Sequence, residues 1–439
     1  MTTFKEQPTR SQEEGSAKLT LAEIFETMMG GDLSIRITAY DGSSAGPEDA
    51  QYGLDLKTPR GTTYLVTAPG DLGLARAYIS GDLELVGAHP GDPYPALKAL
   101  ASDLKFSKPS PLQLANVARS LGIEHFKPIA PPPQEALPRW RRIAEGLRHS
   151  KKRDAEAIHH HYDVSNAFYE WVLGPSMTYT CAYYPNAAAT LEEAQENKYR
   201  LVFEKLNLKA GDRLLDVGCG WGGMVRYAAR RGVKVIGVTL SREQAAWAQK
   251  AIADQGLADL AEVRHSDYRD VRESGFDAVS SIGLTEHIGV ANYPSYFGFL
   301  KSKLRTGGLL LNHCITRPDN KTTSTGGFID RYVFPDGELT GSGRIITAVQ
   351  NVGLEVTHEE NLRHHYALTL RDWCRNLVDN WDEAVAEVGL ATAKVWGLYM
   401  AGSRLGFETN VVQLHQVLAV KLDGKGGDGG LPLRQWWTA

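Results

Sequence analysis

A glycine-rich stretch in the middle of the chain constrains the fold most strongly. Residues 214–222 read LLDVGCGWG, an apolar run followed by the closely spaced Gly218, Gly220 and Gly222. A short apolar run is typical of a buried strand, and glycine lets the backbone turn sharply and approach a ligand closely. A helical pattern begins at Gly222. The stretch therefore predicts a strand, a binding turn and a helix.

Strand and helix patterns alternate around this turn. Apolar segments predict strands at residues 213–217, 233–239, 260–266, 278–282 and 309–315, and helices begin near residues 222, 242 and 293. Alternation with short links favours an α/β fold with a doubly wound parallel sheet, covered by helices on both faces. Ligands of such sheets bind at the carboxyl ends of the strands.

The rest of the chain divides by composition. We expect a disordered polar tail at residues 1–18, a small N-terminal α+β domain at 19–126, a Pro-rich basic linker at 127–144, the α/β domain at 145–421 and a flexible Gly-rich tail at 422–439. In the N-terminal domain, helices are predicted at 22–29, 72–79 and 94–104, and strands at 34–40 and 62–67. The basic run from Arg139 to Arg153 is either a solvated helix face or a contact for anionic lipid headgroups.

Composition excludes several classes of protein. The net charge is −4 and the pI about 6.4, which argues against a basic nucleic-acid binder. The 4 cysteines have spacings of neither a disulfide framework nor a metal site, so we expect a reducing, cytoplasmic setting. No apolar run is long enough to span a bilayer, and we expect any membrane association to be peripheral.

The glycine turn resembles motif I of the class I methyltransferases that bind S-adenosylmethionine. The resemblance implies that Asp216 organises the loop around the methionine part, and that Thr239, Leu240 and Gln244, after the second strand, meet the ribose and adenine. The acid usual at the end of that strand is missing. The remaining expected cofactor-binding residues lie in the turn, before it and after the third strand: Tyr179, Thr180, Gly218, Gly220, Trp221, Gly222, Tyr268 and Arg269.

Further segments narrow the resemblance to the cyclopropane-fatty-acyl-phospholipid synthase family. They are HHYDVSN from His160, MTYTCAYY from Met177, LEEAQ from Leu191, GLTEHIG from Gly283, HCI from His313, RYVFP from Arg331 and HHYALTL from His364. The likeness covers residues 145–421. It implies a seven-stranded methyltransferase sheet with a lid after residue 316. It also implies methyl transfer from S-adenosylmethionine to the cis double bond of a fatty acyl chain.

The resemblance also implies a second bound group, bicarbonate, which takes up the departing proton. Its expected holders are Cys181, Glu286, His313, Ile315 through its backbone, and Tyr366. Imidazole, hydroxyl and backbone N–H groups can hydrogen-bond a small anion, whereas a carboxylate repels it unless a hydrogen is shared. Each side chain also has a structural alternative: a small core residue, a core histidine, a helix cap or a packed ring.

Methyl transfer to an alkene leaves a carbocation, which aromatic faces can stabilise. Candidates are Tyr179, Tyr184, Phe328, Tyr332 and Phe334, although the plainer interpretation of each is pocket wall or core. The sequence departs from the family's pattern at two places. Ser403 stands where relatives carry a cysteine, which argues against covalent catalysis there, and Leu284-Thr285 replaces an aromatic beside Glu286.

The second departure suggests that the cation is diverted to a 10-methylene, tuberculostearic-type acyl chain, which a reductase partner would then reduce. A cyclopropane product is the alternative.

Two other classes compete with a lipid-modifying enzyme. A small-molecule or nucleic-acid methyltransferase could share only the fold. The acidic pI and the absence of an NPPY-type motif disfavour nucleic acid. A catalytically silent lipid-binding protein would be expected to lose the glycine turn or Glu286, and both are present. The expected partners are a phospholipid surface with anionic headgroups, the reductase and a second copy of the chain.

Overall fold

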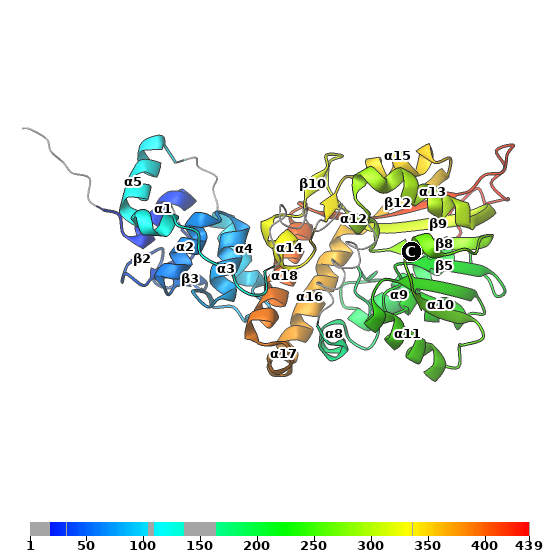
Figure 1. The fold of residues 1–439 in the computed structure, drawn as a ribbon, viewed down its shortest axis with the longest axis horizontal. Helices are drawn as coiled ribbons and strands as arrows, with labels where there is room; N and C mark the ends of the chain where they lie inside the picture. The colour runs from blue at the N-terminus through cyan, green and yellow to red at the C-terminus, as the bar shows by residue number, and fades with distance from the viewer. Residues whose placement is uncertain (1–17, 32, 104–108, 136–163, 336, 439) are drawn as a thin grey trace, which may run out of the picture. The chain divides into compact units, whose positions relative to one another are not determined.

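The computed structural model describes residues 18–31, 33–103, 109–135, 164–335 and 337–438 (Figure 1). They form two compact units. The first is the described part of Met1–Gly87 and Ala99–Ala130, and the second that of Ala88–Lys98 and Pro131–Ala439. Residues 88–98, from within the expected N-terminal domain, therefore belong to the second unit. The expected disordered tail up to residue 17, the basic run and His160 to Asp163 lie outside the described residues.

The first unit combines helices with a four-stranded sheet in the order β2-β1-β3-β4. Its elements are α1 (Leu21–Met29), β1 (Arg36–Ala39), β2 (Ser44–Ala45), β3 (Gly53–Leu56), α2 (Pro59–Thr67), α3 (Asp71–Ile79), β4 (Leu83–Val86), α5 (Pro111–Leu121) and the short 3-10 helix η1 (Ile123–Phe126), while α4 (Tyr94–Asp103) begins in the second unit. The helices predicted at 22–29, 72–79 and 94–104 are confirmed.

The strand predicted at residues 62–67 is wrong, because this segment is the second half of helix α2. Its β-branched and aromatic residues favour a strand when taken alone. The residues just before this segment favour a helix instead. The Thr58 side chain accepts a hydrogen bond from the Gly61 N–H, and Pro59 occupies the first turn, where a helix tolerates it.

The second unit is built on a seven-stranded sheet in the order β12-β13-β9-β8-β5-β6-β7. Its strands are β5 (Arg213–Val217), β6 (Lys234–Thr239), β7 (Ala261–His265), β8 (Phe276–Ile282), β9 (Leu304–Thr316), β12 (Glu355–Asn361) and β13 (Gln413–Val420). Strands β7, β6, β5, β8 and β9 run parallel, whereas β13 pairs antiparallel with both β9 and β12. The five predicted strands are confirmed, and β12 and β13 complete a mixed sheet.

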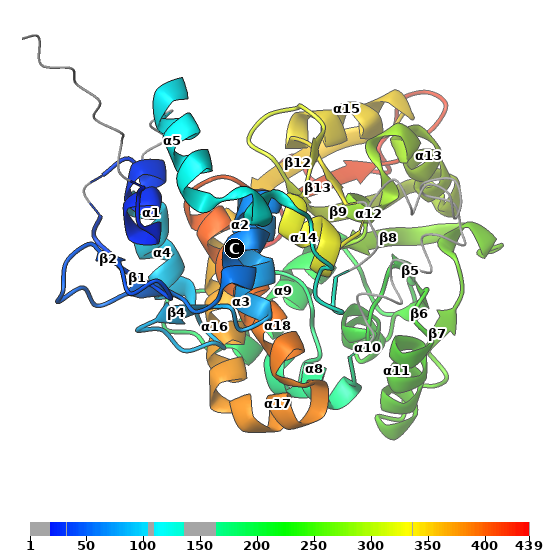
Figure 2. The same cartoon turned by 60° about the vertical axis from the view of Figure 1, so that its left-hand side comes forward.

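Helices cover both faces of this sheet. In Figure 1, α13 and α15 lie on one side of it and α9, α10 and α11 on the other. Helices α16 and α18 pack together beside α8, as both views show (Figures 1 and 2). The helices of the unit are α8 (Asn166–Leu173), α9 (Leu191–Lys205), α10 (Gly223–Ala229), α11 (Arg242–Asp254), α12 (Thr285–Ile288), α13 (Tyr293–Lys303), α14 (Gly327–Tyr332), α15 (Ser342–Asn351), α16 (Arg363–Asp379), α17 (Trp381–Val388) and α18 (Leu390–Glu408), with 3-10 turns η2 (Tyr268–Asp270) and η3 (Val290–Asn292).

The segment between β9 and α15 leaves the sheet. It holds α14 between two short antiparallel strands, β10 (Thr323–Ser324) and β11 (Glu338–Leu339). This is the region after residue 316 where the sequence predicts a lid. Beyond β13, Trp436 donates a 2.8 Å hydrogen bond to the Glu204 carbonyl and Trp437 is buried, so the Gly-rich tail makes defined contacts with the end of α9.

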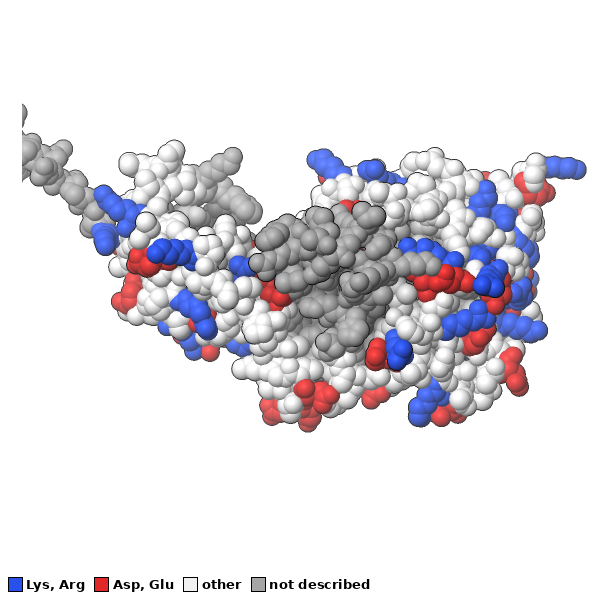
Figure 3. Space-filling model, viewed as in Figure 1, with Lys and Arg blue, Asp and Glu red and all other residues white. Residues whose placement is uncertain are grey.

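The surface of the second unit carries both signs of charge. Figure 3 shows Lys and Arg interspersed with Asp and Glu on the face that it presents. No helix among the described residues is both long enough and apolar enough to cross a membrane.

Candidate functional site

The glycine turn lies where β5 ends. Gly218, Gly220 and Gly222 have φ values of +77°, +54° and +73°, which residues with a side chain rarely adopt. The N–H groups of Gly218 and Cys219 both donate to the Val238 carbonyl, at 2.9 and 3.0 Å. These bonds fix the turn across the carboxyl ends of β5 and β6, the edge at which α/β sheets bind ligands.

A polar pocket, here called the glycine-turn pocket, opens at this edge. Seven of its lining residues are among those expected to bind the cofactor: Tyr179, Thr180, Asp216, Gly218, Gly220, Trp221 and Gln244. Four more lining residues lie in the segments quoted above but were not expected to bind the cofactor: Met177, Thr178, Cys219 and Gly283. The sequence did not point to the remaining five: Lys198, Tyr199, Gly223, Met224 and Ile282.

The other expected cofactor residues do not line this pocket. Gly222 caps helix α10, and the Thr239 hydroxyl donates a 2.7 Å hydrogen bond to Gln244 Oε1. Tyr268 packs edge-on against Tyr296, and Arg269 pairs with Asp267. Leu240 likewise stands outside the lining set. Their contacts to ribose and adenine stay predictions.

Asp216 places a buried carboxyl group in the lining of the glycine-turn pocket. Ser280 on the neighbouring strand donates a 2.7 Å hydrogen bond to Asp216 Oδ1. Burial raises the pKa of Asp216 to about 6, and Ser280 and the nearby Lys198 oppose that rise. Asp216 is therefore a buried carboxylate held in one orientation.

Lys198, from helix α9, is the least expected member of the pocket. Its Nζ donates a 2.8 Å hydrogen bond to Thr180 Oγ1 and lies 4.3 Å from the centre of the Tyr199 ring. Burial lowers the pKa of Lys198 to about 7. The buried face of α9 includes Leu191, Gln195, Lys198 and Lys205, which follow a helical spacing. Two lysines on an otherwise buried helix face were the sequence signal that could have identified Lys198.

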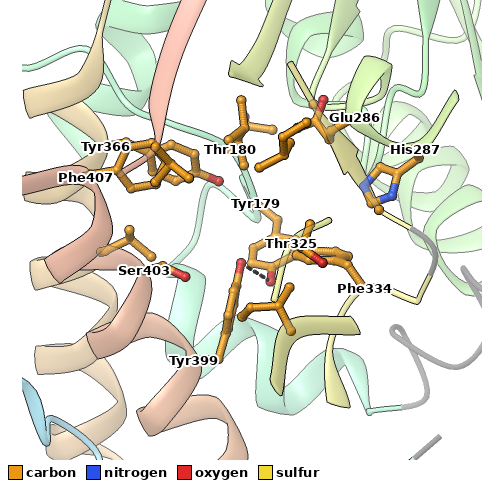
Figure 4. A pocket seen from close by; sticks show the side chains of 17 residues that line it. Tyr179, Thr180, Glu286, His287, Thr325, Phe334, Tyr366, Tyr399, Ser403 and Phe407 are labelled. Atoms are coloured by element: carbon orange, nitrogen blue, oxygen red, sulfur yellow. Dashed lines mark hydrogen bonds between the residues drawn. The ribbon is translucent and has the colours of Figure 1, made fainter. Parts of the chain in front are cut away.

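A second, largely apolar pocket lies beyond the first. Its wall comes from the segment after β8, the segment between β9 and α15, and helices α16 and α18, as Figure 4 shows. The lining residues are Tyr179, Thr180, Gly283, Glu286, His287, Ile315, Thr325, Ile329, Phe334, Gly337, Leu339, Tyr366, Leu370, Tyr399, Ser403, Phe407 and Val412. The Tyr179 hydroxyl donates a 3.1 Å hydrogen bond to the Tyr399 hydroxyl within it.

The two pockets share part of their walls. Tyr179, Thr180 and Gly283 line both. Gly283 has φ +73°, and a Cβ there would lie 2.8 Å from Thr180 Cγ2. Only glycine at position 283 therefore allows these two residues to approach so closely. Together with Tyr179 they form a thin boundary between the polar glycine-turn pocket and the apolar pocket.

Of the five expected bicarbonate holders, Glu286, Ile315 and Tyr366 line the apolar pocket, whereas Cys181 and His313 do not. Glu286 Oε2 and His313 Nε2 are both buried and have no hydrogen-bond partner among the described residues. Burial raises the pKa of Glu286 to about 7, and hydrogen bonding to the backbone of Ile315 opposes this.

Cys181 is fully buried, its thiol lies 3.2 Å from the Ala182 carbonyl, and burial raises its pKa. A protonated thiol is a poor nucleophile.

The two departures from the family pattern have different surroundings. Ser403 lines the apolar pocket, where it offers a hydroxyl instead of the thiol that the resemblance would imply. Leu284 lies against Gly218, and the Thr285 hydroxyl donates to Asn312 Oδ1 at 2.5 Å. Neither Leu284 nor Thr285 lines the apolar pocket. These two residues therefore do not explain a change in the surroundings of a cation bound there.

The aromatic residues that were expected to stabilise the cation fall into two groups. Tyr179 and Phe334 line the apolar pocket, together with Tyr399, Tyr366 and Phe407. Of these last three rings, only Tyr366 was expected at the site, as a holder of bicarbonate. Tyr184 is tied to Asp372 by a 2.8 Å hydrogen bond, and Phe328 and Tyr332 pack on each other outside the pocket lining.

Comparison with known proteins gives one consistent picture. The model of the mycolic acid cyclopropane synthetase family matches residues 149–417. A probable fatty acid methyltransferase of Mycobacterium tuberculosis is 74% identical over 424 residues, 96% of this chain and 99% of that protein. The tuberculostearic acid methyltransferase of that organism is 30% identical over 398 residues, 88% of this chain and 87% of that protein. The crystal structure of a mycolic acid cyclopropane synthase complexed with SAH and CTAB has a TM-score of 0.56 at 30% identity, covering 60% of this chain and 97% of that chain.

Proposed function

The chain belongs to the mycolic acid cyclopropane synthetase family and has a class I methyltransferase fold, and from this we propose that it methylates the cis double bond of an oleoyl-type phospholipid acyl chain, with S-adenosylmethionine as the donor. The observation that carries the proposal is the boundary shared by the two pockets. A polar hollow at a glycine turn suits a charged nucleoside donor, and an apolar hollow suits a hydrocarbon chain.

Bound S-adenosylmethionine supplies an electrophilic methyl carbon. The glycine turn and Asp216 hold the polar part of the donor. Tyr179, Thr180 and Gly283 form the boundary across which the methyl group must face the double bond. An alkene is a weak nucleophile, so this positioning and the exclusion of water from the apolar pocket make up most of the catalysis.

The rings of Tyr179, Phe334 and Tyr399 suit the cationic acyl chain that methyl transfer creates. All three line the apolar pocket. A desolvated cation over an aromatic face is stabilised by about 1–2 kcal/mol. None of these groups is a strong nucleophile at neutral pH, so none of them captures the cation as a free carboxylate or thiolate would.

The expected holders of bicarbonate fit a small anion. Glu286 Oε2 and His313 Nε2 are buried and have no hydrogen-bond partner among the described residues, and Tyr366 adds a hydroxyl, while the backbone of Ile315 already hydrogen-bonds to Glu286. With a pKa of about 7, Glu286 carries a proton in a large share of molecules at neutral pH. A neutral carboxyl can donate to an anion instead of repelling it. Bound bicarbonate would supply the base for proton removal.

For the product we propose a 10-methylene acyl chain, with a cyclopropane as the second candidate. The relative named a tuberculostearic acid methyltransferase matches 88% of this chain, well beyond the methyltransferase domain, and supports the methylene branch. A reductase would have to complete a methyl branch. A methyltransferase for small polar metabolites fits less well, because the second pocket is lined mainly by apolar and aromatic residues.

The proposed substrate also implies where the protein works. A phospholipid acyl chain is met at a bilayer surface, so we propose peripheral association with anionic headgroups from the cytoplasmic side. The basic run from Arg139 to Arg153 supports this proposal by its charge. The reductase and a second copy of the chain remain the other proposed partners, and no nucleic acid is included.

The test is expression in cells rich in oleoyl phospholipid that are fed methyl-deuterated methionine. We expect deuterium in a new fatty acid of the lipid fraction. Mild hydrogenation distinguishes the products, because a methylene branch is reduced and a cyclopropane ring resists. The Asp216→Asn variant should lose the product, and the exposed Glu387→Gln variant should keep it. If the wild-type enzyme puts no labelled carbon into lipid, the proposal fails.

A further inference from the structure

A row of polar side chains crosses three neighbouring strands of the second unit. Glu360 on β12 is the direct cross-strand partner of Gln416 on β13, and Gln416 is the partner of His313 on β9. Directly paired residues of neighbouring strands point to the same face of a sheet. Lys205, the last residue of α9, enters the row from that face.

Lys205 fixes the orientation of the Gln416 amide. Its Nζ donates to Glu360 Oε2 at 2.6 Å and to Gln416 Oε1 at 2.7 Å. An ammonium group has hydrogen-bond donors and no acceptor. The amide oxygen of Gln416 must therefore face Lys205, and its NH₂ group must face the other way.

That NH₂ group meets the His313 ring. Gln416 Nε2 lies 3.1 Å from His313 Nδ1. Because the amide nitrogen donates, Nδ1 must accept, and a neutral imidazole then carries its hydrogen on Nε2. Nε2 is the buried atom of His313 that has no partner among the described residues.

We propose that Lys205 and Gln416 are positioning residues that hold His313 in its Nε2–H tautomer, so that the ring presents a hydrogen-bond donor to a small oxyanion beside Glu286. This inference rests on the proposed function for the identity of that site. In this arrangement His313 orients the anion and does not itself remove the proton, because its lone pair on Nδ1 is occupied by Gln416.

The surroundings of His313 keep the ring neutral. Burial and the positive charges of Lys198 and Lys205 hold the pKa of His313 well below its usual range. An imidazolium would put a second hydrogen on Nδ1, directly against the amide hydrogens of Gln416. Charge and hydrogen bonding therefore favour the same single protonation state.

The outer end of the row is shielded from solvent. The Lys205 side chain has no exposed surface, and its Nζ lies 5.6 Å from the centre of the Trp437 ring. Trp437 is itself buried, and Trp436 is anchored on the Glu204 carbonyl. Water is thus kept from competing with Lys205 for the Gln416 oxygen.

The test reads the tautomer directly by nitrogen NMR of the full-length enzyme labelled with ¹⁵N-histidine. The signals of His313 are assigned from their loss in a His313→Gln variant. We expect a protonated Nε2 and an acceptor-type Nδ1 in the wild-type protein. A hydrogen on Nδ1, alone or in an imidazolium, would overturn the proposal whatever the enzyme methylates.

Variants then connect the tautomer to turnover. In Gln416→Glu the new carboxylate still accepts from Lys205 but also accepts from His313, so the hydrogen moves to Nδ1. We expect kcat to fall about tenfold to a hundredfold, as for groups that orient metal-bound histidines, while KM for the donor stays within about twofold. Lys205→Arg should retain more activity than Lys205→Met, because arginine also only donates.

The matched control is Gln413→Glu, which adds the same charge on the same strand outside the row. It should leave both the His313 signals and kcat as in the wild type. If Gln416→Glu leaves the tautomer unchanged, or changes it without lowering kcat, the positioning role is refuted. A wild-type enzyme that shows the expected tautomer but methylates no lipid would instead refute the proposed function.

Discussion

Gly283 faces Thr180 so closely that a single added carbon would lie 2.8 Å from Thr180 Cγ2. This contact joins the loop after β8 to the segment before α9, at the boundary between the glycine-turn pocket and the apolar pocket. It is also where the proposed donor and acceptor must meet, so small changes here should have large effects.

Gly283→Ala should therefore reduce both stability and activity. The residue has φ +73°, and an alanine in that conformation costs about 1–3 kcal/mol before the clash with Thr180 is added. We expect a lower melting temperature and a large loss of methyl transfer, measured by calorimetry and by incorporation of labelled methyl groups into lipid.

Two comparisons make this prediction specific. Gly298→Ala, inside helix α13 with open space around the new carbon, should raise stability by up to about 1 kcal/mol and leave activity unchanged. Adding Thr180→Ser to Gly283→Ala removes the clashing methyl group and keeps the hydroxyl bound by Lys198, so part of the activity should return. No recovery in the double variant would mean that backbone strain alone is responsible.

Asp216→Asn should weaken binding of the donor. The carboxylate is buried, held by Ser280 and close to Lys198, so the amide loses the charge that balances this lysine. We expect the dissociation constant for S-adenosylmethionine, measured by calorimetric titration, to rise about tenfold or more. Asp254→Asn, which changes an exposed pair with Lys250, is the control and should bind as the wild type does. Unchanged binding by Asp216→Asn would contradict the role given to this carboxylate.

Glu286→Gln should stabilise the protein in a pH-dependent way. Because the pKa of Glu286 is raised to about 7, the folded state holds a proton that the unfolded state releases from about pH 4.5. The wild type therefore loses stability as the pH rises from about 4.5 to 7, by about 3 kcal/mol in total, and no more above that. The variant has no such penalty.

The measurement is thermal unfolding at about pH 5 and about pH 8. The advantage of Glu286→Gln over the wild type should be small at the lower pH and larger at the higher one, although the variant methylates no lipid. Glu387→Gln, at an exposed position, should show no such trend. An equal effect at both pH values would show that Glu286 titrates normally.

The cysteines should be unreactive in the folded enzyme. Cys181, Cys219, Cys314 and Cys374 are all buried, and burial raises the pKa of each thiol. Mass spectrometry after brief treatment with iodoacetamide should find no labelled cysteine in the native protein and four after denaturation. Rapid native labelling of Cys181 together with loss of activity would argue for a nucleophilic thiol.

The parts of the fold set by local signals could be predicted from the sequence. Strand β5 occupies its predicted residues 213–217, because an apolar run between a turn and glycines has few alternatives. Strands β12 and β13 were missed. β12 alternates exposed and half-buried residues with four charges or histidines among seven, and β13 is defined by pairing with β9, about a hundred residues earlier. Only the assembled sheet reveals such pairing.

Only part of the candidate site could be predicted, for a similar reason. The resemblance led to Glu286, Ile315 and Tyr366, which line the apolar pocket. It also led to His313, whose role depends on Gln416 and Lys205. Neither Gln416 nor Lys205 belongs to a sequence motif. Their contacts with each other and with His313 can be recognised only once the strand register is known. Lys198 was overlooked because a single lysine is usually solvated.

The thin wall of Tyr179, Thr180 and Gly283 has a consequence for inhibitor design. One synthetic molecule that links an adenosyl group to an alkyl tail would occupy both hollows at once. Tethering makes the second contact intramolecular, and linked ligands of this kind can gain about 10²–10⁴ in affinity over either half. Methyltransferases without an apolar pocket beside the donor would hold only the nucleoside end, so the tail would supply selectivity against them.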